Sequence, residues 1–184
     1  MSKLYRFFNI PAIITLFITA CSAQVVQTSP EQHETPKVAL YNLMLGRSLN
    51  DKDVVDFITS NNCDSLNQFQ LCKDTGVAFW MDSEQIVKTV YLYSENAEGF
   101  RRYQGALPYK LSFYDPMWKV EEKLKDPNAD EKSQPNQKAG LPDEAGSPDH
   151  IHYWAVYKRL GLTVIYNSPG ADEDAYIYAI LINH

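Results

Sequence analysis

Few residues of this chain have the type and spacing that metal binding requires. His150 and His152 alternate, so on a strand both side chains would project from one face with Asp149 beside them. The sequence supplies no third ligand at a regular spacing, and two ordinary surface histidines are the simpler interpretation. The acidic run 172–174 follows a Pro-Gly pair but lacks the Asp-x-Asp-x-Asp-Gly pattern of a calcium loop. The sequence therefore predicts neither a metal site nor a cofactor.

Patterns typical of covalent catalysis and of phosphate binding are also missing from the sequence. It contains no Gly-x-Ser-x-Gly nucleophile elbow and no glycine-rich phosphate loop. A carboxylate pair for glycoside hydrolysis would have to be assembled by the fold, so the sequence leaves that chemistry open. These patterns favour a binding protein over an enzyme.

Composition limits the classes of partner. The chain has 184 residues, of which 45% are hydrophobic, so it is long enough to bury a core as one domain or two small halves. Its formal net charge is −6. An acidic chain is poorly suited to nucleic acid, whose phosphates attract basic patches, and to charge-driven docking on anionic lipid. We expect no nucleic-acid partner.

The N-terminus has the pattern of a secretion signal over residues 1–20. Lys3 and Arg6 provide the positive region, and an apolar stretch follows that is interrupted by Asn9 and Pro11. This stretch is too short to span a bilayer stably. We therefore expect an exported protein.

The residues Ile18-Thr19-Ala20-Cys21 resemble the bacterial lipobox. The resemblance implies that Cys21 is diacylated, that the signal is cut before it and that the new amine is acylated. Two or more acyl chains hold a protein on a membrane, whereas one chain does so only marginally. Ser22 stands where Asp would favour the inner membrane, so resemblance to Gram-negative lipoproteins implies an outer-membrane lipoprotein facing the periplasm. A Gram-positive host would change that last step, and an ordinary signal peptide cut after Ala20 or Ala23 is the alternative.

Cys63 and Cys72 are the two thiols that remain if Cys21 carries lipid. An exported chain meets an oxidising compartment, so we expect these two cysteines to form a disulfide. Closing a loop of about ten residues stabilises a fold by roughly 2 to 3 kcal/mol in the chain-entropy model. A redox or metal pair is the alternative, although the spacing is not C-x-x-C and no histidine is adjacent.

Apolar periodicity predicts an α+β fold with helices packed on an antiparallel sheet. Residues 21–37 are polar and read as a flexible tether, and two folded units follow at 38–94 and 103–184. Each unit runs from a capped helix into strands, which makes the two halves candidates for an internal repeat. Between the last helix and the last strands, residues 125–149 read as a disordered or mobile loop. The predicted helices are 48–58, capped by Ser48 or Asn50, and 116–124, capped by Asp115. The predicted strands are 77–81, 85–93, 152–157, 162–166 and 175–182.

Short motifs in both units resemble known bacterial families. Leu45-Gly46-Arg47-Ser48 before a capped helix and a strand pair is similar to the unit of small outer-membrane lipoproteins in barrel assembly. Two such units in tandem resemble the beta-lactamase inhibitor protein fold. The stretch 105–111, with the helix after it, resembles uncharacterised bacterial proteins often encoded near toxin immunity genes. These resemblances imply binding proteins without catalytic centres.

The functional expectation is a lipid-anchored, non-enzymatic envelope protein that binds a protein partner. That partner is either a toxin that the chain neutralises or an envelope assembly machine. Aromatic residues dominate protein contacts, so a sheet face carrying six of them is the predicted surface. The six are Trp80, Tyr91, Tyr93, Trp154, Tyr157 and Tyr166. The alternative is a periplasm-facing ligand-binding or hydrolytic lipoprotein that uses the 125–149 loop as a lid.

Overall fold

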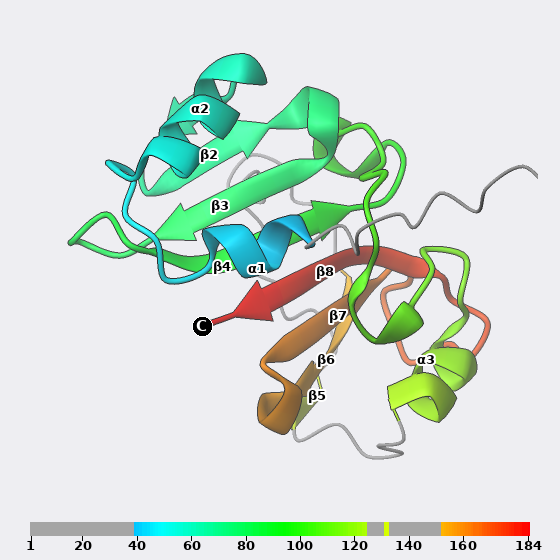
Figure 1. The fold of residues 1–184 in the computed structure, drawn as a ribbon. Helices are drawn as coiled ribbons and strands as arrows, with labels where there is room; N and C mark the ends of the chain where they lie inside the picture. Colours follow the sequence, from blue (N-terminus) through cyan, green and yellow to red (C-terminus); the bar gives the residue numbers. More distant parts are fainter. Residues whose placement is uncertain (1–38, 125–130, 133–151) are drawn as a thin grey trace, which may run out of the picture. The chain divides into compact units, whose positions relative to one another are not determined.

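A computed structural model describes residues 39–124, 131–132 and 152–184 (Figure 1). The predicted signal peptide, Cys21, the 21–37 tether and His150 lie outside these residues, as does most of the 125–149 loop. None of the helices in the described part is long and apolar enough to cross a membrane.

The described residues form mainly antiparallel sheet with three short α-helices, in keeping with an α+β class. The helices are α1 (Leu40–Met44), α2 (Lys52–Ser60) and α3 (Met117–Leu124). The strands are β1 (Asp64–Leu66), β2 (Phe69–Cys72), β3 (Val77–Met81), β4 (Val87–Tyr93), β5 (Glu131–Lys132), β6 (Tyr153–Tyr157), β7 (Leu162–Tyr166) and β8 (Ile177–Asn183). They make one sheet in the order β1-β2-β3-β4-β8-β7-β6-β5 (Figure 1).

The strands of the two predicted units belong to this single sheet because β4 pairs with β8. Tyr91 lies opposite Leu181 in that antiparallel pairing, and Thr89 lies opposite Asn183. The side chains of Thr89 and Asn183 also share a hydrogen bond of 2.9 Å. Strands from both ends of the described chain are therefore held in one register at the middle of the sheet.

The first two strands were not predicted from the sequence. β1 and β2 form a hairpin between the two cysteines, with Asp64 opposite Leu71. The predicted disulfide between Cys63 and Cys72 is present and closes this hairpin at its open end. Strand pairing and the covalent link therefore hold the same short segment.

Side chains alternate across the sheet and form two apolar clusters, one on each face. The helix-side core includes Met44 of α1, Val54 of α2 and Val120 of α3, together with inward strand residues such as Phe79. Phe57 of α2 meets Phe79 edge-on, with ring centroids 5.7 Å apart. The opposite core contains Leu71, Ala78, Tyr91, Tyr93, Ala97, Phe100, Trp154, Ile165, Ala179 and Leu181. Both faces of the sheet are therefore packed.

The turns before α2 and α3 share one hydrogen-bond pattern. The backbone N–H of Ser48 donates to the Asp51 carboxylate at 3.3 Å, and that of Ser112 donates to the Asp115 carboxylate at 2.8 Å. Each serine hydroxyl in turn accepts a bond from the backbone N–H two residues later. A Ser-x-x-Asp sequence thus folds the chain into the same turn ahead of each helix.

The turns between β2 and β3 and between β6 and β7 also match. Each is a 3-10 turn closed by a glycine in the left-handed region, Gly76 with φ +72° and Gly161 with φ +60°. Glycine is the residue that adopts this conformation at least cost. The strand pairs that follow carry a register shift at the corresponding place, after Trp80 in β3 and after Ile165 in β7.

Candidate binding surface around Arg102

The six aromatic residues predicted to share one surface lie on both faces of the sheet. Trp80, Tyr91, Tyr93 and Trp154 belong to or pack against the opposite core. Tyr157 and Tyr166 belong to the helix-side core. The expectation of a single aromatic face was therefore wrong for Tyr157 and Tyr166. Trp154 and Tyr157 stand three residues apart on one strand, and an odd spacing places side chains on opposite faces.

The six aromatic side chains differ in how much of their surface is exposed to solvent. Tyr93, Tyr157 and Tyr166 are completely or almost completely buried, Tyr91 and Trp154 are buried, and Trp80 is partly exposed. Burial raises the pKa of Tyr166 far above its usual range, and the neighbouring Tyr157 raises it further. In this structure these side chains pack in or against the two cores of the sheet. A role for them in partner binding stays a prediction.

A more exposed surface is built on the connector, which we define as residues 94–111 between β4 and the turn before α3. Its backbone runs beside the sheet: Arg101 N–H donates to the carbonyl of Lys73 at 2.9 Å, and Tyr103 N–H to that of Tyr93 at 3.0 Å. The Tyr178 hydroxyl of β8 accepts from Glu98 N–H and donates to the Glu98 carboxylate. The connector is therefore held to the sheet by hydrogen bonds, although residues 95–102 fell outside both predicted folded units.

The backbone of the connector holds unusual conformations. Asn96, Glu98, Tyr109 and Lys110 all have φ between +49° and +62°, a region that non-glycine residues seldom adopt. Such conformations cost about 1 to 3 kcal/mol each and persist only where surrounding contacts impose them. They are typical of segments whose shape matters for function.

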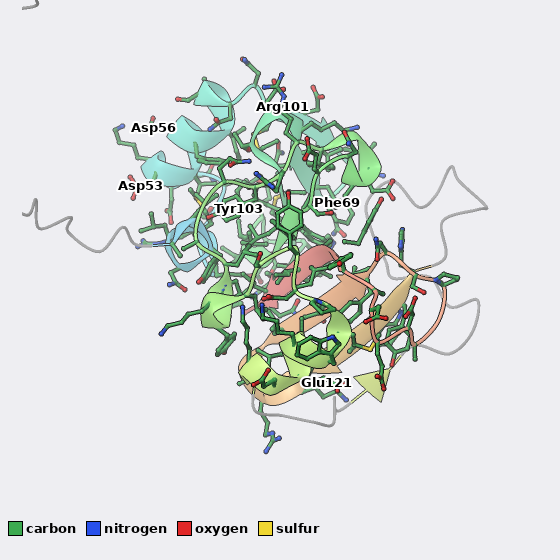
Figure 2. The ribbon with its side chains drawn as sticks, turned by 90° about the vertical axis from the view of Figure 1, so that its right-hand side faces the viewer. Asp53, Asp56, Phe69, Arg101, Tyr103 and Glu121 are labelled. Carbon is green, nitrogen blue, oxygen red and sulfur yellow. A yellow bond between two sulfur atoms is a disulfide. The ribbon has the colours of Figure 1, made fainter. Side chains whose placement is uncertain are left out.

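Arg102 lies at the centre of this surface because it lines three adjacent hollows. The first, about 340 Å³, is lined by Arg102, Tyr103, Gln104, Gly105, Ala106, Leu107, Leu111, Ser112, Phe113 and Tyr114. The second, about 350 Å³, is lined by Ser94, Glu95, Arg102, Phe113, Tyr114, Asn167, Tyr176, Ile177 and Tyr178. The third, about 200 Å³, is lined by Glu95, Asn96, Arg101, Arg102 and Gln104. Figure 2 looks onto the face that carries Arg101 and Tyr103 of the connector and Glu121 of α3.

The guanidinium of Arg102 is oriented by one tyrosine. It lies over the Tyr114 ring, 5.5 Å from the ring centroid, and Nη1 donates a hydrogen bond to the Tyr114 hydroxyl. No carboxylate in the described part of the chain lies within ion-pair distance of Arg102. Its neighbour Arg101, by contrast, pairs with Asp74 at 3.3 Å. The remaining N–H groups of the Arg102 guanidinium can therefore bind an acceptor from outside.

Tyr114 and Tyr176, which line these hollows, are exposed to solvent, as is Trp118 at the start of α3. Tyr114 is 66% exposed, and Trp118 and Tyr176 are each 50% exposed. Pro116 forms a β-bridge with Tyr176, and Trp118 N–H donates to the carbonyl of Glu173, so the start of α3 is fastened to the segment that leads into β8. We call Arg102, Tyr114, Trp118 and Tyr176 the Arg102 surface.

The position of Trp118 follows from how α3 is packed. Met117, Val120 and Leu124 form its buried stripe, so Trp118, one residue from Met117, points away from the core. The helix start is held by Asp115, which Lys119 and Lys123 contact at 3.1 and 2.5 Å. Burial alone would raise the pKa of Asp115, but hydrogen bonds from the two lysines and from Ser112 N–H outweigh it and lower that pKa.

Those candidate metal ligands that lie in the described residues contact other groups of the protein. His152 stacks on Tyr178 with ring centroids 4.0 Å apart, and its Nδ1 lies 3.1 Å from the Tyr166 carbonyl. His150 lies outside the described residues. The Asp172 carboxylate accepts from Asp174 N–H at 3.1 Å, so the acidic run shapes a turn. Within the described ranges, no group of three or more His, Cys, Asp or Glu side chains is arranged to hold a metal.

Comparison of the chain with family models, with curated proteins and with solved structures finds no match. The chemistry of the Arg102 surface therefore has to be argued from its own residues. Exposed tyrosine, tryptophan and arginine are the residues most enriched among those that dominate protein interfaces. One residue of this surface could have been found from the sequence pattern of α3, because Trp118 does not belong to the apolar face formed by Met117, Val120 and Leu124.

Proposed function

We propose that this chain is a lipid-anchored, non-enzymatic envelope protein that binds a protein partner through the Arg102 surface. The observation that carries the proposal is a contrast in exposure. The aromatic residues of both core clusters are packed away, whereas Tyr114, Trp118 and Tyr176 stay at least half exposed, and Tyr114 and Tyr176 line a hollow together with one oriented arginine. Side chains of this kind bury large areas with little loss of conformational entropy when a partner covers them.

The anchor and location in this proposal rest on the sequence. The lipobox-like residues before Cys21 support acylation of that cysteine, and Ser22 supports the outer membrane. Within this function the partner is either a toxin that the chain neutralises or a component of envelope assembly. Acylation of Cys21 predicts that the wild-type chain fractionates with membranes and that the Cys21→Ala variant does not.

We also propose that the architecture is two repeated helix-plus-sheet halves whose helices pack on one face of the sheet. Three features support the repeat: the Ser-x-x-Asp turns at Ser48 and Ser112, the left-handed glycines Gly76 and Gly161, and the register shifts in β3 and β7. The helix-side core supports the packing of the helices. In this architecture the connector joins the halves, and the Arg102 surface lies at their junction.

Site-specific photo-crosslinking in the host envelope tests the proposed function. A photoreactive phenylalanine analogue replaces Tyr176, and in a matched control it replaces Leu66, an exposed apolar residue of edge strand β1. We expect one discrete protein adduct from position 176 and none from position 66. Adducts from position 66 alone, or no protein adduct from either, would contradict the proposal.

A further inference from the structure

We infer that the Arg102 surface receives an extended segment of the partner protein that carries an aspartate or glutamate next to an apolar side chain. This inference rests on the proposed function and specifies the chemistry of the partner. In the bound state, the acidic side chain lies in the first hollow against Arg102. The apolar side chain lies in the second hollow between Tyr114 and Tyr176.

The arrangement of the hollows favours an extended chain. The first and second share Arg102, Phe113 and Tyr114 as walls, the second and third share Glu95 and Arg102, and the first and third share Arg102 and Gln104. Three connected, open hollows that meet at Arg102 suit a peptide whose neighbouring side chains enter different hollows, as in other modes of peptide recognition. A compact small ligand would instead be expected in a single deep cavity.

The charge distribution fixes where the acidic side chain goes. Glu95 lines the second and third hollows, so a carboxylate placed there would meet a like charge. No Asp or Glu lines the first hollow, where Arg102 lies beside the polar side chains of Gln104 and Ser112. Arginine binds carboxylates through two parallel N–H bonds, and the hydrogen bond to the Tyr114 hydroxyl together with the cation–π contact orients the Arg102 guanidinium.

The second hollow has the lining that an apolar side chain needs. Phe113, Tyr114, Tyr176, Ile177 and Tyr178 supply most of its wall. Asn167 contributes its Oδ1 to a bond from Tyr176 N–H at 2.9 Å, which fixes the backbone that carries the exposed Tyr176 ring. An apolar residue entering here removes both tyrosine rings from water, so the peptide gains burial next to its ion pair.

A membrane surface is the other class of partner that exposed Trp, Tyr and Arg side chains can meet. The acidic groups around the Arg102 surface disfavour binding to an anionic membrane. Glu95 lines two of the hollows, and Glu173 and Asp174 precede Tyr176 in the segment that bonds to α3. Anionic headgroups would be repelled by these carboxylates, whereas a single partner carboxylate can be directed to the first hollow.

The test begins with a phage-displayed library of random 12-residue peptides selected on the full chain. The most enriched peptide is synthesised with a fluorophore, and its affinity is measured by fluorescence polarisation for wild type, Arg102→Gln and Arg47→Gln. Arg47 is a matched control because it is also an exposed arginine, and it lines none of the three hollows. A second peptide with Gln in place of the acidic residue tests the same contact without altering the protein.

We expect enriched peptides to share an acidic residue adjacent to an apolar one. Loss of a charged hydrogen-bonded contact predicts about tenfold weaker binding for Arg102→Gln and for the Gln peptide, with Arg47→Gln unchanged. Enriched peptides without an acidic residue, or binding that survives both changes, would overturn the inference. If Tyr176→Ala still abolished that binding, the proposed function would stand while this inference failed. Binding of the full chain to phosphatidylglycerol vesicles through Trp118, with no peptide enriched, would overturn both.

Discussion

Lys123 donates a hydrogen bond of 2.5 Å to Asp115, whose carboxylate is almost completely buried at the start of α3. Lys119 contacts the other carboxylate oxygen at 3.1 Å, and Ser112 N–H bonds to the carboxylate at 2.8 Å. The Asp115 side chain therefore links the turn at Ser112 to Lys119 and Lys123 of α3 in a single network. Because Trp118 lies between Asp115 and Lys119 in the chain, this network also fixes the helix turn that carries Trp118.

Replacing Asp115 with alanine should destabilise the protein strongly. The change removes the shared acceptor of Ser112 N–H and of two partly exposed lysines, and loss of hydrogen bonds to a charged group costs about 3 kcal/mol. Asp51→Ala is the matched control, because Asp51 accepts the equivalent bond from Ser48 N–H at 3.3 Å but its side chain is 43% exposed. Loss of that hydrogen bond should cost about 1 kcal/mol. Urea unfolding at neutral pH measures both losses in free energy of unfolding. Equal losses for the two variants would show that the burial of Asp115 does not increase its contribution to stability.

The same carboxylate makes a prediction about acid stability. The pKa of Asp115 is lower in the folded state than in the unfolded chain, where the pKa of an aspartate is about 3.9. Its contribution is therefore complete above that pH and is lost as the pH falls through the lower folded value. The free energy of unfolding should drop less steeply with acid in Asp115→Asn than in wild type. Parallel pH profiles for the two proteins would contradict the network.

Removing the disulfide should weaken the β1–β2 hairpin and the fold together. The pair Cys63→Ser and Cys72→Ser opens a loop of about ten residues, so the free energy of unfolding should fall by roughly 2 to 3 kcal/mol. Chemical denaturation of the double variant measures the loss, and wild type with a reductant should lose a similar amount. An unchanged midpoint in both cases would mean that strand pairing alone holds this segment.

Much of the fold was predictable from the sequence because most strands show strong apolar patterns. The predicted strand 77–81 is β3, the predicted 162–166 is β7, and the predicted helix 48–58 overlaps α2. β1 was missed because Asp64-Ser65-Leu66 is short and polar, and all three residues are exposed. Such a strand exists through its pairing with β2 and the adjacent disulfide, which are contacts that a local pattern does not display.

The candidate surface was harder to predict for a different physical reason. Strand aromatics were expected to bind a partner, but the fold uses them to fill two cores, as Tyr93 and Tyr166 show. The exposed side chains come from turns and helix starts that tertiary contacts bring together. Arg102 and Tyr114 are twelve residues apart, and the strained connector backbone places them in contact. A contact of this kind cannot be predicted from composition or from apolar periodicity.

The buried Tyr166 predicts a loss of stability in alkali. Its pKa is raised in the folded state by burial and by Tyr157, whereas the pKa of a tyrosine in the unfolded chain is about 10. Above that pH the unfolded chain releases a proton that the folded chain keeps, so the free energy of unfolding falls as the pH rises. Tyr166→Phe should show a shallower decline between about pH 10 and 11 than wild type. Denaturant unfolding across this range measures it, and equal slopes would place the phenol in contact with water.

Gly76 and Gly161 offer a matched pair that separates backbone conformation from steric room. Both lie in the left-handed region, so an alanine at either costs about 1 kcal/mol in backbone strain. At Gly76 a Cβ would also lie 2.3 Å from the Arg101 carbonyl and 2.4 Å from the Tyr103 nitrogen. At Gly161 its nearest neighbour would be the Asn183 carbonyl at 3.0 Å. Gly76→Ala should therefore be the more destabilising change, by at least about 2 kcal/mol in thermal or urea unfolding.

The Gly76 change should also reach the binding surface, because the atoms it displaces are backbone on either side of Arg102. If Gly76→Ala folds, the connector must shift, and the peptide selected on wild type should bind it more weakly than it binds Gly161→Ala. The comparison is made at a temperature where both variants are fully folded, so stability does not enter the measured affinity. Equal affinities for the two variants would show that Arg102 binds its partner independently of where the β2–β3 turn holds the connector.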